Sequence, residues 1–107
     1  MENKKYLMIH ADDAGLAWSE NLATQDGMIN GSISSTSLMV PCPWFYEMAK
    51  FCLNCSASNF EIHLVLRGKC EYYPFRPLCI LNNIPSIIND NGYFHSLRKP
   101  FETTVKA

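Results

Sequence analysis

The sequence predicts an α/β domain that starts with parallel β-α-β-α-β units. Three apolar segments of strand length alternate with two segments of helical length, which is typical of a parallel sheet with helical crossovers. The first apolar segment runs directly into Asp12 and Asp13, as strands do when they deliver charged groups to the carboxyl edge of such a sheet. A length of 107 residues with 48% hydrophobic content fits one small domain over 1–107.

The first unit consists of a strand, a loop and a helix. The nearly unbroken apolar run predicts a buried strand over about Lys5–Ala11. Ala14–Trp18 is expected to be a loop, because Ser19, followed by Glu20, resembles a helix start with an acid in the first turn. This helix should continue to about Asn30, with the next residue, a glycine, as its cap.

The second unit and the third strand follow the same alternation. Ser32–Val40 is rich in β-branched and apolar residues and is predicted to be a strand. Pro41-Cys42-Pro43 ends it and sets up the first turn of a second helix. That helix carries an apolar stripe at helical spacing, expected to pack on the sheet: Trp44, Phe45, Met48, Ala49, Cys52 and Leu53. Asn59–Leu66 alternates in polarity and predicts the third strand.

The rest of the chain lacks this regularity. Arg67–Asn83 is rich in aromatic residues and proline, without a clear period. Ile84–Asp90 is interpreted as a short strand or a turn, and Asp90-Asn91-Gly92 as a tight turn. Lys99–Ala107 resembles the approach to a further helix.

Composition narrows the classes of partner and the compartment. The formal net charge is −1 and no basic stripe is present, which argues against nucleic acid as the main partner. No apolar segment approaches the ~20 residues that span a bilayer, so no membrane association is expected. Met1–Lys5 leads straight into the first strand without a signal peptide, which predicts a cytoplasmic protein. The sequence leaves homo-oligomerisation open.

The five cysteines do not suggest a disulfide framework, because their number is odd. Cys52 and Cys55 have the C-x-x-C spacing of zinc and redox sites. A zinc site needs a second pair, and Cys70 and Cys79 are too far apart to supply one. A redox motif should open a helix after a strand, whereas this one is predicted to close a helix. These thiols are therefore expected to be structural or incidental.

The candidate chemistry lies at the predicted carboxyl edge of the sheet. Two adjacent carboxylates repel one another, and one of them binding a metal while the other handles a proton would explain the pair. His63 lies on the more polar face of the third strand near the same edge, and imidazole with carboxylate suits a catalytic divalent metal. A catalytic metal usually has three protein ligands, so one more is needed. Strand alternation is expected to turn His10 away from the site, and His95 lies in the irregular region, so neither is expected to be that third ligand.

Several segments in order closely resemble the amino-terminal part of the YdjC-like carbohydrate deacetylases. They cover nearly the whole chain: Ala11-Asp12-Asp13-x-Gly15, Asn21, Ser35–Pro43, Ile62-His63-Leu64-x-Leu66, Tyr72–Leu78 and Ile84–Phe94. The resemblance implies a (β/α)-barrel-like (TIM-like) fold and a role in carbohydrate metabolism. The reaction that it implies is hydrolysis of N-acetyl groups on amino sugars or chito-oligosaccharides, with a divalent metal, Mg²⁺ or Zn²⁺.

The same resemblance implies roles for individual residues. Asp12 corresponds to the catalytic base, and Asp13 and His63 to metal ligands. Two positions depart from the family pattern: Ala14 replaces an aromatic residue, and Glu61 replaces a glycine. Glu61 is predicted to share a side of the strand with the histidine, where it would crowd the metal, hydrogen-bond the imidazole or add a ligand. Five aromatic residues are candidates for stacking on sugar rings, although packing is the preferred interpretation for most of them: Trp18, Trp44, Tyr72, Tyr73 and Phe75.

The resemblance also predicts that the chain is an incomplete, truncated domain. A full barrel typically needs ~250 residues, and the family's last metal-binding histidine lies beyond the matched region. A truncated, non-catalytic remnant of the family is therefore the main alternative. A receiver-like signalling domain is a weaker one, because such domains need an aspartate at the end of the third strand, and here Ile62–Gly68 contains none.

Overall fold

The computed structural model describes residues 3–55, 59–66, 73–79 and 81–95. The segment Lys99–Ala107, most of the aromatic stretch before Tyr73, and Cys70 lie outside the described residues. The chain divides into two compact units, Met1–Leu64 and Val65–Ala107, each of which is described by itself.

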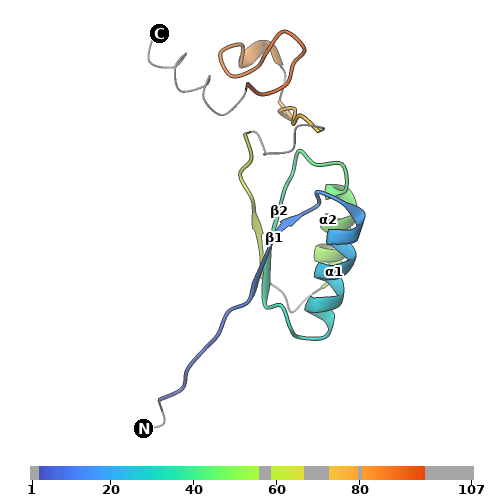
Figure 1. Cartoon of the computed structure of the whole chain (residues 1–107), viewed down its shortest axis with the longest axis vertical. Coiled ribbons are helices and arrows are strands. Elements are labelled where there is room, and N and C mark those ends of the chain that lie inside the picture. The colour runs from blue at the N-terminus through green and yellow to red at the C-terminus, as the bar shows by residue number, and fades with distance from the viewer. Residues whose placement is uncertain (1–2, 56–58, 67–72, 80, 96–107) are drawn as a thin grey trace. The chain divides into compact units, whose positions relative to one another are not determined.

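The first unit is built on a parallel three-stranded sheet (Figure 1). Its strands are β1 (His10–Ala14), β2 (Ser35–Leu38) and β3 (Asn59–Ile62), in the order β1-β2-β3. The first two strands are in register with His10 opposite Ser35. The predicted parallel β-α-β-α-β start is therefore confirmed.

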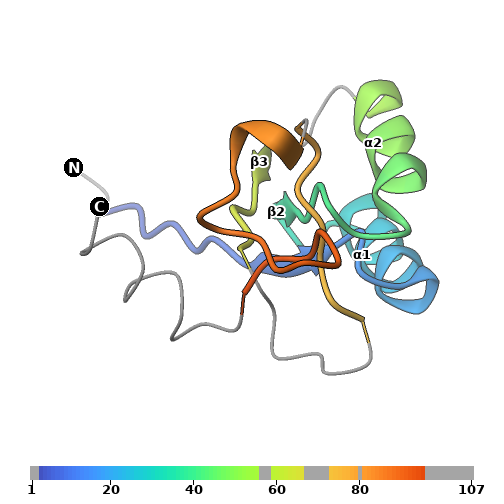
Figure 2. The same ribbon diagram turned by 90° about the horizontal axis from the view of Figure 1, so that it is seen from above.

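Two helices connect the strands and lie on the same side of the sheet (Figures 1 and 2). They are α1 (Trp18–Ile29) and α2 (Phe45–Asn54). Consecutive right-handed crossovers between strands in sequential order place every helix on one face, which is the arrangement that a barrel needs. Neither helix in the described part of the chain has the length and apolar character that crossing a bilayer requires.

Glycine ends the first helix as the sequence predicts. Gly31 has a φ of +76°, and the amides after Asn30 bond back to Met28 and Gly27, which is a Schellman cap. The start differs from the prediction: the helix begins at Trp18, and its N-cap Ala17 offers no side-chain hydrogen bond. Ser19 therefore lies inside the helix and does not cap it.

The core lies between the sheet and the helices. Ala14, Met28, Leu38 and Met48 form its buried centre, and several residues of the predicted stripe on α2 pack against them: Phe45, Ala49 and Cys52. Ala14, which replaces the family's aromatic residue, is fully buried here. The stripe prediction fails at Leu53, whose side chain is 88% exposed at the end of α2.

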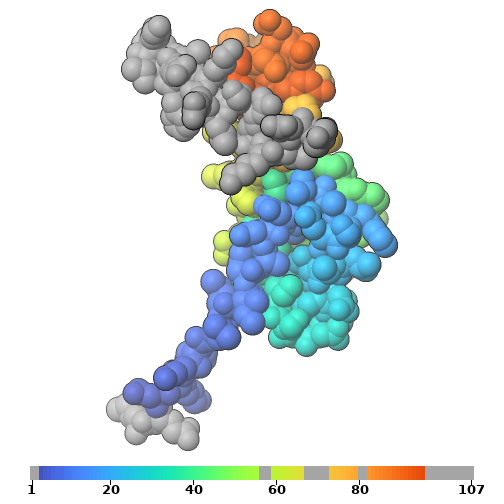
Figure 3. All heavy atoms as spheres, in the orientation of Figure 1, coloured from blue at the N-terminus to red at the C-terminus, as the bar shows by residue number. Residues whose placement is uncertain are grey.

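All three strands are shorter than predicted. Most of the apolar run before His10 lies outside the strand and is exposed: Tyr6 is 89% exposed, and the segment projects from the body of the first unit (Figure 3). The residues after α1 form its cap, so the paired part of β2 begins at Ser35. Upstream of β1, the Ile9 carbonyl still accepts hydrogen bonds from the amides of Ser34 and Ser35. β3 ends at Ile62, and Leu64, predicted to lie within that strand, is 90% exposed. Apolar pattern alone therefore overestimated the strands, because a strand requires a partner along its length.

The second unit is organised around a tight turn. Ile88 and Phe94 form an isolated antiparallel bridge, and Gly92, with a φ of +76°, donates a hydrogen bond to the Asn89 carbonyl. The predicted turn at Asp90-Asn91-Gly92 is thus confirmed. Arg76 stabilises the turn through two contacts: its guanidinium lies 4.4 Å from the centre of the Tyr93 ring and donates a hydrogen bond to the Asn91 carbonyl. Phe75 and Phe94 are buried in this unit.

Candidate metal-binding site

A bulge in β1 carries the two acids. Ala11 pairs with Thr36 and Ala14 with Leu38, so β1 uses one residue more than β2 between these pairs. The extra length falls at Asp12 and Asp13, and Asp13 has a φ of +62°, in the left-handed region. In a regular strand, neighbouring side chains point to opposite faces, and a bulge re-aims one of them. The backbone therefore turns Asp13 at a conformational cost of about 1–3 kcal/mol.

The turned carboxylate lies close to His63, which directly follows β3, on the far side of β2 in the strand order. His63 Nδ1 lies 3.2 Å from Asp13 Oδ1, and the backbone amide of His63 donates to the Leu38 carbonyl, which fixes its position along the sheet. The prediction that these two residues lie at one edge of the sheet agrees with this geometry. Their roles as ligands stay predictions.

The contact between these two atoms is not a hydrogen bond. His63 Nδ1 is buried and has no hydrogen-bond partner among the described residues, although the carboxylate oxygen is within ion-pair distance. Buried polar atoms without a partner are uncommon and costly. Two atoms that each bind one divalent ion at about 2.1 Å lie roughly 3.0–3.4 Å apart. The pair therefore fits two positions of a metal's coordination sphere.

Asp12 points to a different set of neighbours. Its side chain is 73% exposed, and its Oδ1 lies 3.4 Å from the Ser37 hydroxyl, which donates to it, and 3.5 Å from His10 Nε2. The interpretation that alternation turns His10 away from the acids is wrong for Asp12. Residues two apart in a strand share a face, so His10 and Asp12 belong together.

A buried asparagine holds the loop that follows the acids. Asn21 on α1 is 0% exposed and accepts a 2.7 Å hydrogen bond from the Gly15 amide. Its own amide group donates to the Trp44 carbonyl and to Glu47 at the start of α2. One side chain thus ties the acid loop to both helices, a positioning role that helical periodicity could not reveal.

The remaining candidates do not join this site. Within the described residues, no group of three His, Cys, Asp or Glu side chains is placed to hold a metal, so exposed Glu61 does not complete a triad with Asp13 and His63. His95 belongs to the second unit, where its amide donates to the Ile87 carbonyl.

The C-x-x-C motif lies at the carboxyl end of α2, with Cys55 as the C-cap residue, as predicted. Burial, together with the neighbouring Cys55 thiol, raises the pKa of Cys52 to about 11. A thiol with a raised pKa is a poor nucleophile and a poor metal ligand at neutral pH. This environment supports the interpretation of Cys52 as a packing residue.

Comparison with known proteins decides the family. The sequence profile of a family described as YdjC-like protein matches residues 6–107. The chain belongs to the YdjC-like family. Carbohydrate deacetylases of Thermoanaerobacter pseudethanolicus and Geobacillus stearothermophilus are each 30% identical to it over 90 residues, or 84% of the chain.

A solved relative shares the fold of this YdjC-like chain. The crystal structure of an Enterococcus faecalis V583 protein, described provisionally as a cellobiose-phosphate cleavage protein, matches with a TM-score of 0.65 at 22% identity. The match covers 90% of the chain and 36% of that protein. The chain likewise spans about a third of the curated relatives, 34% and 33% of their lengths.

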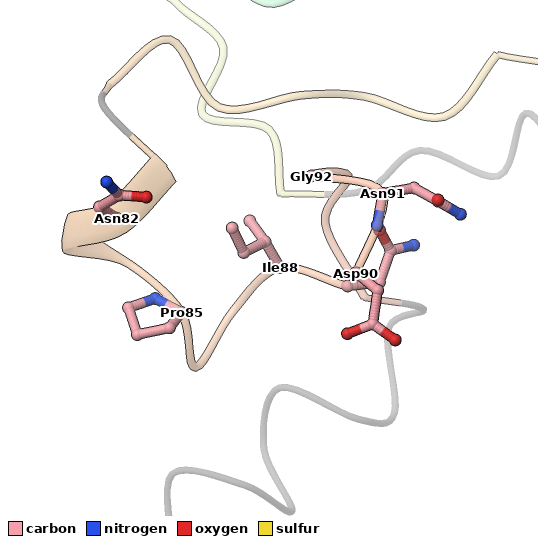
Figure 4. Close-up of a pocket in the computed structure, with 7 residues that line it drawn as sticks. Asn82, Pro85, Ile88, Asp90, Asn91 and Gly92 are labelled. Atoms are coloured by element: carbon pink, nitrogen blue, oxygen red, sulfur yellow. The ribbon is translucent and has the colours of Figure 1, made fainter.

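A hollow in the second unit contains none of the predicted site residues (Figure 4). Its volume is about 540 Å³, and it is lined by residues around the tight turn: Asn82, Pro85, Ile88, Asn89, Asp90, Asn91 and Gly92. Asn89 Oδ1 already accepts hydrogen bonds from the amides of Asn91 and Tyr93, so this side chain serves the turn itself.

Proposed function

We propose that this chain supplies the base and two metal ligands of a hydrolase that removes N-acetyl groups from amino sugars or chito-oligosaccharides. One observation carries the proposal: buried His63 Nδ1 lacks a hydrogen-bond partner in the part of the chain that the structure describes and lies 3.2 Å from Asp13 Oδ1, next to a second acidic residue. The names of the two curated relatives support the same chemistry. Family membership and a suitable pair of ligand atoms thus agree.

Asp13 and His63 would hold the divalent ion, Mg²⁺ or Zn²⁺. Such an ion polarises a carbonyl and lowers the pKa of bound water, which is what hydrolysis of an acetamide needs. The bulge gives Asp13 its orientation, and the hydrogen bond between the His63 amide and the Leu38 carbonyl sets the height of the imidazole along the sheet. Two protein ligands bind a metal more weakly than the usual three. We therefore expect weak binding by these 107 residues.

Asp12 would act as the base. Its carboxylate is largely open to solvent and makes no ion pair with the predicted ligands, so it is free to accept a proton from an attacking water. The two acids would then have different roles, because Asp13 faces His63 and Asp12 faces solvent. Hydrolysis of the amide releases acetate and leaves a free amine on the sugar.

Two tryptophans near the acid loop offer surfaces for a sugar. Trp18 starts α1 three residues after Gly15, and the Trp44 amide donates to the Gly15 carbonyl. Both rings are partly exposed, which leaves their faces available for stacking on a pyranose. Tyr73 is also partly exposed, whereas Phe75 is buried and serves packing.

The decisive experiment is a metal titration. Mn²⁺, a paramagnetic stand-in for Mg²⁺, should broaden the His63 imidazole signals in the NMR spectrum of the chain before those of His95. Asp13→Asn and His63→Gln should weaken this binding at least tenfold, while Glu61→Gln, which alters an exposed carboxylate outside the pair, should leave it unchanged. Broadening that ignores the first two substitutions would contradict the proposed site.

Acetate release tests the reaction itself. N-acetylated chito-oligosaccharides are incubated with the chain and Mg²⁺ or Zn²⁺, and acetate is measured with Asp12→Asn as the control. Turnover abolished by that substitution would support the deacetylase. Metal binding without any acetate release would favour the non-catalytic alternative for this chain.

A further inference from the structure

We propose that His10 and Ser35 form a positioning pair for Asp12, in which the Ser35 hydroxyl donates to a neutral His10 and so keeps the His10 Nε2–H turned toward the carboxylate. The inference rests on the proposed function, because it explains how the predicted base is held. His10 Nδ1 lies 2.7 Å from Ser35 Oγ, and His10 Nε2 lies 3.5 Å from Asp12 Oδ1. The imidazole therefore bridges a buried hydroxyl and the exposed acid.

The register of the sheet brings these groups together. His10 and Ser35 are paired across β1 and β2, and Asp12 and Ser37 follow two residues later on the same strands. Side chains two apart share a face. Leu38, the next residue along β2, belongs to the core beneath the helices. The four polar groups consequently occupy the opposite face of the sheet.

Hydrogen-bond chemistry determines the direction of each bond. An ionised carboxylate offers only lone pairs, so the ring nitrogen that lies 3.5 Å from Asp12 Oδ1 is the one that carries the proton. In a neutral imidazole the other nitrogen then accepts, and the short contact with Ser35 must be donated by the hydroxyl. Ser35 is almost completely buried, which limits competition from water for this bond.

The consequence concerns which oxygen of Asp12 takes the proton. Oδ1 accepts a hydrogen bond from the Ser37 hydroxyl and lies within ion-pair distance of His10 Nε2. Oδ2 is then the oxygen left to accept a proton from water. A largely exposed carboxylate would otherwise rotate among several rotamers. His10 thus acts through Asp12 and does not itself contact the predicted ligands.

The test is the tautomer of His10, read from ¹⁵N–¹H correlation spectra of the full chain at pH 8 without metal. His10→Gln assigns the signals among the three histidines. We expect a single neutral tautomer with the proton on Nε2. Ser35→Ala should shift part of the population to the Nδ1–H form, while Ser37→Ala, which removes the neighbouring donor on the same face, should leave the His10 tautomer unchanged.

Two results would overturn the assignment. A dominant Nδ1–H tautomer or a doubly protonated ring at pH 8 would mean that Ser35 does not donate, and a spectrum unaffected by Ser35→Ala would remove its role. This readout needs neither metal nor turnover, so it fails independently of the proposed function. Absence of Mn²⁺ binding would refute the metal site, whereas the tautomer decides the positioning pair.

Discussion

The acid loop depends on close contact between Gly15 and the start of α2, and Gly15→Ala tests that dependence. Gly15 has a φ of +98°, and an added Cβ would lie 3.1 Å from Phe45 Cα and 3.4 Å from both the Phe45 nitrogen and the Met39 carbonyl oxygen. All three atoms belong to the backbone and cannot rotate away. The substitution therefore forces either the loop or the helix to move.

The expected loss has two parts. A left-handed conformation costs an L-residue roughly 1–2 kcal/mol, and overpacking against rigid atoms adds about 1–3 kcal/mol. Alanine also lowers the conformational entropy of the unfolded chain, which offsets about 0.4–1 kcal/mol of this loss. We therefore expect Gly15→Ala to lower the free energy of unfolding by about 3 kcal/mol, within a range of roughly 1–5 kcal/mol.

Gly31→Ala is the matched control. Its φ of +76° is also left-handed, but no heavy atom lies within 4 Å of the added Cβ. Only the conformational part remains, so we expect a loss of about 1 kcal/mol. The difference between the two variants isolates the steric contact at Phe45.

Urea unfolding followed by tryptophan fluorescence measures both losses. The two tryptophans of the chain, Trp18 and Trp44, lie in the first unit, so the signal reports on the unit that contains both glycines. Equal losses for Gly15→Ala and Gly31→Ala would refute the reasoning, because they would show that the close approach to α2 costs nothing.

Three further outcomes follow from side chains inside the first unit. Asn21→Ala should cost about 1–3 kcal/mol in urea unfolding, because the Gly15 amide loses its buried acceptor. Met48→Ala, at a fully buried core position, should cost about 2–5 kcal/mol, whereas Leu53→Ala on exposed α2 surface should stay within about 0.5 kcal/mol. Cys52 should react with iodoacetamide more slowly than exposed Cys79 at pH 8, since its pKa is about 11. Because the folded-state pKa lies above the ordinary 9.0, the contribution of Cys52 to stability should hold below pH 9 and fall between pH 9 and 11, which urea midpoints across that range would show.

The order of elements was predictable because hydrophobic pattern and turn residues act locally. Each of the signals depends only on residues that are close in sequence: the apolar runs, the stripe on α2 and the glycine at the end of α1. Strand ends were predicted less well. Whether Tyr6 or Leu64 is buried depends on a neighbouring strand, and the sequence of one strand carries no information about where its partner stops.

The candidate site was predictable in its residues but not in its geometry. An acid pair after an apolar run pointed to Asp12 and Asp13. The sequence does not reveal the bulge that makes their side chains point in different directions. The proximity of His10 to Asp12 was not predicted, because the two acids were treated as one site, whereas side chains two apart in a strand, such as these, share a face. Asn21 offered only a weak signal, a polar residue on a helix, because its partners lie in segments distant in sequence.

The exposed apolar segment before β1 has a practical consequence for experiments in solution. Tyr6, Leu7 and Met8 extend the line of an edge strand with large apolar side chains open to water. Such a segment can add a strand from another molecule, and this self-association grows with protein concentration. The apparent molecular mass from light scattering should accordingly rise between micromolar and millimolar samples. Leu7→Lys, which places a charge in the segment, should suppress that rise without changing the urea midpoint of the dilute protein.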